Sequence, residues 1–316
     1  MKLGVILAAL VGLAVAIWLV FNIGLAAVSN AIAAVGFDGF GLLCLLALAT
    51  FVVLGAAWFA LMPGAPFWSF VWGRIVRDAA GEVLPFSQLG GILIGVRALI
   101  LRGIVAPSAF ASSVVDVTTE MMAQIVFILI GIALFAAHSG SELPAATISG
   151  IVFVLAGSVA FIVLQRRGLV LAERLAERFL PTVARQTREF HIAVKDIYDH
   201  PSRLAASSAI HLIGWIASAI GTWLTIRLIG GHIEMADAIA IESILCALRS
   251  AAVFVPGALG VQEAGYALML PLFGLPPEMG LAVSLLKRGR EIAIGVPVLL
   301  MWQGLEGRRV LAAPEI

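Results

Sequence analysis

The feature that most constrains this chain is a break in an otherwise apolar region, at Arg249–Tyr266, RSAAVFVPGALGVQEAGY. Pro256 has no amide donor, and the glycines that follow it weaken a helix, so backbone polar groups are freed there. Hydrocarbon cannot satisfy such groups, which are tolerated only where they are buried in protein or line a hydrated cavity. The break therefore predicts a polar interior, and the rest of the chain is interpreted as its scaffold.

The composition is typical of a polytopic membrane protein. Of the 316 residues, 61% are hydrophobic and 12% are charged, whereas soluble domains have about half apolar and about a quarter charged residues. A formal net charge of +1 argues against a nucleic-acid partner, which would require a basic face. Cys44 and Cys246 lie in apolar runs and are interpreted as core residues. The five histidines are scattered, so we expect no metal and no other cofactor.

Long apolar runs predict an all-α membrane fold with about seven or eight transmembrane helices. The first run is too long for the apolar part of a signal peptide and is interpreted as a helix. Two segments, Gly81–Gly103 and Pro256–Phe273, are interrupted by proline and glycine and are interpreted as broken or re-entrant elements. The uninterrupted spans are Leu3–Val28, Gly39–Leu61, Phe110–Ala137, Ala145–Leu164, Leu204–Ile229, Ala236–Phe254 and Leu281–Trp302.

The distribution of basic residues predicts that both termini face the cytoplasm. No Lys or Arg occurs in the loops that we place outside, which are Ser29–Asp38, His138–Pro144, Gly230–Asp237 and Gly274–Glu278. Basic residues concentrate on the other side. They are Lys2, Arg74, Arg77, Arg308, Arg309 and those of the connector Gln165–Arg203, which holds eight of the twenty Lys and Arg residues.

The connector permits two interpretations. Leu171, Leu175 and Phe179 repeat every four residues, as on an amphipathic helix at a membrane surface that attracts anionic lipid. The alternative is a solvated cytoplasmic connector with one apolar face.

The chain is predicted to be one integral-membrane domain that contains an inverted repeat. Residues 39–164 and 204–304 are the proposed halves, and each has a span, an interruption and a span with charges. The segment 85–90 resembles the segment 256–260, with the spacing off by one. Paired interruptions of this kind indicate a transporter binding site where the repeats meet.

Polar side chains inside the apolar elements are the candidate site residues, because charge within a membrane is costly and usually functional. Asp116 and Glu120 share one helix face, and Glu263 is the foremost candidate because no basic residue lies within four positions of it. The candidates are Arg97, Asp116, Glu120, Arg249, Gly257, Gln262, Glu263, Lys287, Arg288, Arg290 and Glu291. Two structural alternatives stay open: basic side chains of the last span reach the membrane edge, and Arg249 pairs with Glu242.

Three segments, GEVLPFSQLGG, SSVVDVTTE and VFVPGALGVQEAGY, resemble the lysylphosphatidylglycerol synthase/flippase transmembrane family. The resemblance covers nearly the whole chain and is closest to the branch associated with hopanoid biosynthesis. It implies a bacterial inner-membrane protein that moves a lipid, with hopanoids as candidate cargo and hopanoid-biosynthetic or export proteins as candidate partners. The site residues that it implies are Glu82, Pro85, Gln88, Gly90, Asp116, Glu120, Arg249, Pro256, Gly260, Gln262 and Glu263. The chain ends at Ile316 without the aminoacylating domain of bifunctional relatives, so we expect no aminoacyl transfer.

Three functions stay open. A flippase would move its lipid downhill or coupled to protons or another ion through Glu263, Asp116 or Glu120, since the sequence has no phosphate-binding loop motif for ATP. A non-transporting scaffold for lipid biosynthesis would tolerate neutralisation of single membrane charges. A membrane-embedded lipid-modifying enzyme would need a nucleophile–base set or a metal cluster, and the sequence shows neither. We therefore expect a transporter rather than an enzyme.

Overall fold

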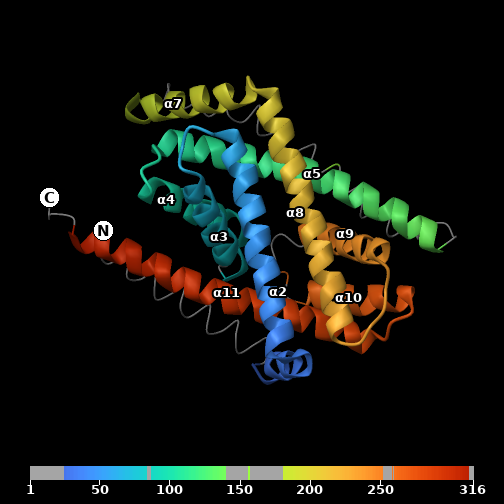
Figure 1. Ribbon diagram of the computed structural model, residues 1–316. Coiled ribbons are helices and arrows are strands. Elements are labelled where there is room, and N and C mark those ends of the chain that lie inside the picture. Colours follow the sequence, from blue (N-terminus) through green and yellow to red (C-terminus); the bar gives the residue numbers. More distant parts are fainter. Residues whose placement is uncertain are drawn as a thin grey trace.

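The computed structural model describes residues 25–83, 87–139, 156, 181–251, 258 and 260–312. All the regular elements in these residues are helical (Figure 1). In chain order they are α2 (Leu25–Leu61), α3 (Phe67–Val83), α4 (Ser87–Leu101), α5 (Ala106–Ser139), α7 (Pro181–Tyr198), α8 (Pro201–Leu228), α9 (Met235–Ala251), α10 (Val261–Met269), the short 3-10 helix η2 (Leu270–Phe273) and α11 (Pro277–Ala312).

The predicted all-α membrane fold is confirmed. Within the described residues, three helical stretches are long and apolar enough to cross a membrane: Asn30–Leu61, Ala106–His138 and Pro201–Leu228. They correspond to the spans predicted at Gly39–Leu61, Phe110–Ala137 and Leu204–Ile229. Outside the described residues lie most of the predicted span Leu3–Val28, nearly all of Ala145–Leu164, the first part of the connector, and the site candidates Pro85, Pro256 and Gly257.

One predicted loop is wrong. Residues 29–38 were expected to connect two spans, but they are helical and belong to α2, interrupted only by a kink at Gly36. Gly36 has φ 79° and ψ 160°, a backbone conformation that glycine adopts without the steric cost of a Cβ. The first turns of α2 therefore lie at an angle to the rest of the helix, as Figure 1 shows.

The interrupted segment Gly81–Gly103 is a tight helical hairpin. Helices α3 and α4 are joined by residues 84–86 and run antiparallel in close contact. A Cβ added to Gly91 would lie 2.5 Å from the carbonyl oxygen of Arg77, and one added to Gly95 would lie 2.7 Å from the Cβ of the same arginine. Only glycine permits backbones to approach this closely, so these positions define the hairpin.

The second interrupted segment also separates two packed helices. Helix α9 ends at Ala251 and α10 begins at Val261, and Gly265 of α10 packs directly on Leu245 of α9. The long helix α11 follows α10 and η2, as α5 follows α4. Both halves of the chain thus have the same order, two packed helices and then a long one. In Figure 1 the two pairs lie on either side of α2 and α8, which contact each other.

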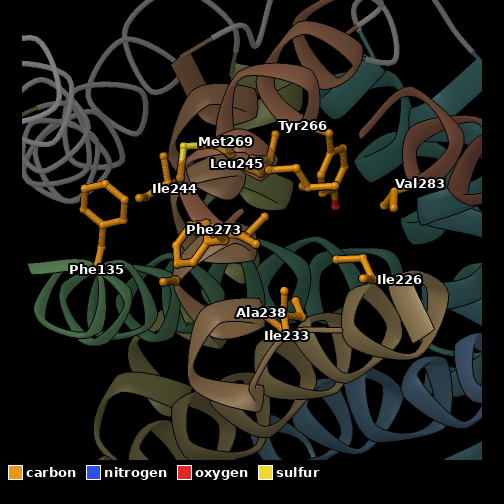
Figure 2. Packing of buried hydrophobic residues seen from close by; sticks show 13 residues of the cluster. Phe135, Ile226, Ile233, Ala238, Ile244, Leu245, Tyr266, Met269, Phe273 and Val283 are labelled. Carbon is orange, nitrogen blue, oxygen red and sulfur yellow. The ribbon is translucent and has the colours of Figure 1, made fainter. Parts of the chain in front are cut away.

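Two apolar clusters stabilise the halves. The first is centred on Trp58, Phe70 and Leu99 and joins α2, α3, α4 and α5; Val194 and Ile197 of α7 complete it. The connector is therefore helical over α7 and packs against the helical bundle through its apolar face. The second cluster, shown in Figure 2, joins α8, α9, α10 and α11 around Tyr266 and Leu245. The ring of Tyr266 packs in this apolar cluster, and its hydroxyl hydrogen-bonds to Glu242, in one of the polar groups described below.

The hairpin geometry makes one stability prediction. We expect Gly91→Ala to lower the free energy of unfolding by about 1–3 kcal/mol, because its Cβ would overlap the α3 backbone. Gly41→Ala is the matched control, since a Cβ at Gly41 in α2 meets nothing within 4 Å. Thermal unfolding of both variants in detergent would test this. Equal melting temperatures for the two variants would contradict the close α3–α4 contact.

Candidate functional site

The two packed helix pairs meet through an ion pair. Glu82 lies at the end of α3 and Arg249 near the end of α9, and Arg249 Nη2 donates to Glu82 Oε1 at 2.9 Å. Of the alternatives for Arg249, pairing with Glu242 is not what the structure shows, because Arg249 donates to Glu82, 167 positions away. Both partners stand just before the interruptions at which their helices end. The ends of α3 and α9 are therefore held together by opposite charges.

Arg288 of α11 joins this contact from a third direction. Its Nη1 lies 3.5 Å from Glu82 Oε2 and 3.6 Å from Glu291 Oε2, and its Nε donates to Glu263 Oε1 at 3.2 Å. Arg288 is buried, with 3% of its surface exposed. We call these five residues, Glu82, Arg249, Glu263, Arg288 and Glu291, the junction cluster.

Glu263 also caps a helix, a role that was not predicted from its position in the sequence. Its Oε2 accepts a hydrogen bond from the backbone amide of Gly260 at 2.8 Å. Gly260 precedes the first residue of α10 and has φ 79°. The carboxylate therefore caps the start of α10 and also binds Arg288 and Ser284. Its partners are local to the helix start and to α11, which explains why no basic residue occurs near it in the sequence.

Several buried polar atoms of this region have no hydrogen-bond partner in the part of the chain that the structure describes. They are Glu82 Oε2, Gln262 Oε1, Arg288 Nη2 and Glu291 Oε2. Gln262 is fully buried, and its amide nitrogen donates to Ser284 at 3.0 Å. Buried polar groups are normally paired, with water where no protein group is available. The junction cluster thus has unused donor and acceptor capacity of both kinds.

A second polar group, which we call the first-half charge cluster, lies between α3, α5 and α8. It consists of Arg74, Arg77, Asp78, Asp116, Glu120 and His211. Arg74 donates to Asp78 at 2.8 Å and to both Glu120 oxygens at 2.6 and 2.9 Å. Arg77 donates to Asp116 at 2.7 Å and to Glu120 at 2.7 Å.

This cluster corrects the interpretation of Arg74 and Arg77. Both were predicted to mark an aqueous side, but they are 4% and 6% exposed and their guanidinium groups are enclosed by carboxylates. Asp116 and Glu120 do share one helix face, and that face turns toward α3. Arg97 does not join either cluster; it is about half exposed and pairs with Glu306 of α11 at 2.6 Å.

The third polar group is a buried ion pair between α9 and α11, which we call the Lys287–Glu242 cluster. Lys287 Nζ donates to both Glu242 oxygens at 2.7 and 2.8 Å. Thr222, Ser218 and Tyr266 donate further hydrogen bonds to the same carboxylate, at 2.6, 2.7 and 2.6 Å. Glu242 is thereby surrounded by donors, as a buried carboxylate must be.

The remaining candidates are placed as follows. Gly90 and Gln88 lie in α4, and the side chain of Gln88 is not among the described ones. Arg290 lies on α11 facing α8, where its Nη1 would be 3.7 Å from a Cβ placed on Gly221. Within the described residues, no group of three His, Cys, Asp or Glu side chains is arranged to hold a metal ion.

His211 is the main residue that the sequence interpretation missed. It is fully buried, and its Nε2 lies 3.0 Å from Asp116 Oδ1. The signal was available, because an ionisable residue within the apolar span Leu204–Ile229 is costly unless it has a partner. Tyr266 and Thr222 gave no comparable signal, since a lone hydroxyl in an apolar helix is common.

A comparison with known families gives a match over most of the chain. A family model described as the lysylphosphatidylglycerol synthase TM region matches residues 5–298, which include all three polar clusters. Among curated proteins and solved structures, none matches.

The Lys287–Glu242 cluster makes a prediction about stability. We expect Lys287→Met to lower the free energy of unfolding by about 3–5 kcal/mol, because it leaves a buried carboxylate without its cation. The double variant Lys287→Met/Glu242→Leu should recover much of that loss, since no charge is then buried unpaired. Arg97→Gln, at a half-exposed pair, should cost no more than about 1 kcal/mol. Denaturant titrations of all three variants would measure the differences; a double variant less stable than the single one would contradict the pairing.

Proposed function

Since the chain belongs to the family of the lysylphosphatidylglycerol synthase transmembrane region, we propose that it is a flippase, which moves a polar lipid from one leaflet of a membrane to the other. Membership of this family, together with the membrane-spanning helices, indicates a membrane-lipid function. Transport, rather than lipid modification, is our proposal.

The observation that carries this proposal is the junction cluster. Four buried polar atoms, one of them Arg288 Nη2, have no hydrogen-bond partner in the described residues where the ends of α3 and α9 meet α11. Transporter sites are commonly built where two interrupted membrane elements meet, because freed backbone and side-chain groups there replace water around a polar substrate. The junction cluster offers both guanidinium donors and carboxylate acceptors to a lipid headgroup.

The outer surface of the bundle fits a lipid whose tail stays in hydrocarbon. Large apolar side chains are exposed on both helix pairs, among them Leu93 of α4 and Leu268 of α10. A headgroup that crosses a hydrocarbon region of about 30 Å needs polar contacts only along its own path. In the proposed mechanism the headgroup takes over the contacts between Glu82, Arg249 and Arg288 as it passes, while the tail follows along these apolar faces.

The cargo in this proposal is a hopanoid or a related polar lipid, and the protein lies in the bacterial cytoplasmic membrane with both termini in the cytoplasm. Support for the cargo comes from the likeness of the segment Pro256–Glu263 and of the basic last helix to the hopanoid-associated branch. Support for the orientation comes from the segments His138–Pro144, Gly230–Asp237 and Gly274–Glu278, which contain no Lys or Arg. Hopanoid-biosynthetic or export proteins are proposed partners.

Movement of a labelled lipid in proteoliposomes tests the proposal. We expect Glu82→Gln and Arg249→Gln each to slow protein-dependent movement at least about tenfold, which corresponds to about 1.4 kcal/mol in the barrier. Arg97→Gln is the matched control, because it removes a guanidinium from an ion pair outside the junction cluster. Glu263→Gln should slow movement too, but its effect includes the loss of charge from the cap of α10.

Comparing a hopanoid with phosphatidylglycerol in the same vesicles would identify the cargo. A preference for the hopanoid would support the proposed branch of the family. If folded wild-type protein moved neither lipid, or if Glu82→Gln and Arg249→Gln both moved lipid at the wild-type rate, the flippase proposal would be wrong. A scaffold for lipid biosynthesis would then be the better explanation.

A further inference from the structure

We propose that the first-half charge cluster is a proton-binding site, centred on Asp116 and His211, and that lipid movement is coupled to the proton bound there. The coupling rests on the flippase function proposed above, whereas the binding of a proton does not. The two other polar groups fit this role less well: in the Lys287–Glu242 cluster the carboxylate already has a cation of its own, and the junction cluster contains arginine as its only cation.

The geometry of the pair is that of a shared proton site. His211 Nε2 lies 3.0 Å from Asp116 Oδ1, and both side chains are fully buried. Asp116 Oδ2 accepts from Arg77 at 2.7 Å, so the carboxylate is held in place from its other side. An imidazole in this position can take up a proton without moving, because the charge that forms faces an anion already present.

The charge balance of the cluster leaves room for one proton. Arg74 and Arg77 carry two positive charges, and Asp78, Asp116 and Glu120 carry three negative ones, which gives a formal charge of −1 when His211 is neutral. A proton on His211 brings the sum to zero. Unbalanced charge is expensive in a low-dielectric interior, and a proton bound here would remove that imbalance.

The second ring nitrogen of His211 also supports a proton-binding site. His211 Nδ1 is buried and has no hydrogen-bond partner among the described residues. The same is true of Ser208 Oγ and Trp215 Nε1 of α8 and of Ser113 Oγ of α5. Positions 208, 211 and 215 share one face of α8. Trp215 stacks on Phe127 of α5, with ring centroids 5.9 Å apart, so this face turns toward α5.

A row of unpaired donors and acceptors along a helix seam is where internal water is held. Water there would complete the hydrogen bonds of Ser113, Ser208, Trp215 and His211. It would also connect the imidazole with the solvent, and chains of polar groups and water of this kind carry protons in membrane proteins. The α5–α8 seam is the route that we assign to the proton.

Among the described residues, Asp38 of α2, Glu242 of α9 and Arg290 of α11 lie away from His211 along α8. The charged residue of α2 is Asp38, which lies far from His211. Its neighbour Gly39 packs on Leu228, at the opposite end of α8. From α9, Glu242 contacts Ser218 and Thr222, two or more turns farther along α8. Arg290 of α11 lies at Gly221, also farther along.

Helix α7 contacts α8 and α5, and its described charged side chains, Arg188, Glu189, Lys195 and Asp196, are exposed, whereas His191 is half-buried. The charged group in direct contact with His211 among the described residues is Asp116 of the first-half charge cluster.

Helix α3 connects this site with the junction cluster. Arg77 belongs to the proton site and Glu82 to the junction, and the separation of five positions between them spans about 7.5 Å along the helix. A proton that neutralises the cluster weakens the hold of its carboxylates on Arg77 and Arg74 and so changes how firmly α3 is held against α5. The end of α3 carries Glu82, so the Glu82–Arg249 contact is altered as well.

Two readouts test the inference. The first is movement of labelled lipid in vesicles with and without an imposed pH gradient, for wild type, His211→Gln and His138→Gln. His138 is the matched control, a half-exposed histidine paired with Asp237 outside the cluster. We expect the pH gradient to change the rate of lipid movement several-fold in wild type and in His138→Gln. In His211→Gln, the ratio of the rate with the gradient to the rate without it should be about one. Circular dichroism and size-exclusion chromatography would confirm that the variants fold.

The second readout is proton uptake by the purified protein in detergent after a downward pH step, which needs no lipid movement. Wild type should take up about one proton more than His211→Gln. His138→Gln should take up as much as wild type after the proton that His138 itself binds is subtracted from the wild-type value. Equal uptake by wild type and His211→Gln would overturn the inference, and so would a gradient response in His211→Gln equal to that of wild type. If wild type moved lipid at a rate indifferent to the gradient, the coupling would be wrong while the flippase proposal stood. If wild type moved no lipid, the flippase proposal and the coupling would fail together, and proton uptake would still decide the binding site.

Discussion

The structure depends on ion pairs buried between the first helix of each packed pair and the long helix that follows. Arg77 of α3 binds Asp116 of α5, and Glu242 of α9 binds Lys287 of α11. A charge in hydrocarbon without its partner is far more costly than the pair together. Each pair therefore fixes how its helices lie, and the polar clusters follow from that placement.

Glycine supplies the other half of this arrangement. In the first pair of helices, Gly91 and Gly95 let α4 approach α3 so closely that a methyl group would collide with the backbone or the Cβ of Arg77. In the second half of the chain, Gly280 lets α11 reach the backbone of Tyr266 in α10, where an added Cβ would lie 2.6 Å from the carbonyl oxygen. Association of helices within a membrane relies on such small residues, because burial of apolar surface gives little driving force there.

Local patterns predicted the elements better than their contacts. Apolar runs located α5 and α8, and the spacing of Asp116 and Glu120 identified a polar face. The partners were not predictable, since Glu82 and Arg249 lie 167 residues apart and nothing in their spacing links them. Buried Arg74 and Arg77 were mistaken for residues at an aqueous side for the same reason: the carboxylates that neutralise them come from another helix.

The two halves use opposite signs at corresponding places. Asp116 and Lys287 each stand ten residues after the first residue of their helix, Ala106 and Pro277. As α3 carries the cations of the first half and α9 the anion of the second, α3 in the place of α9 would set arginine against Lys287, and α9 in the place of α3 would set Glu242 against Asp116. Such like-charge contacts are strongly unfavourable in a membrane interior. The reversed polarity thus prevents two halves of similar shape from exchanging helices while the chain assembles.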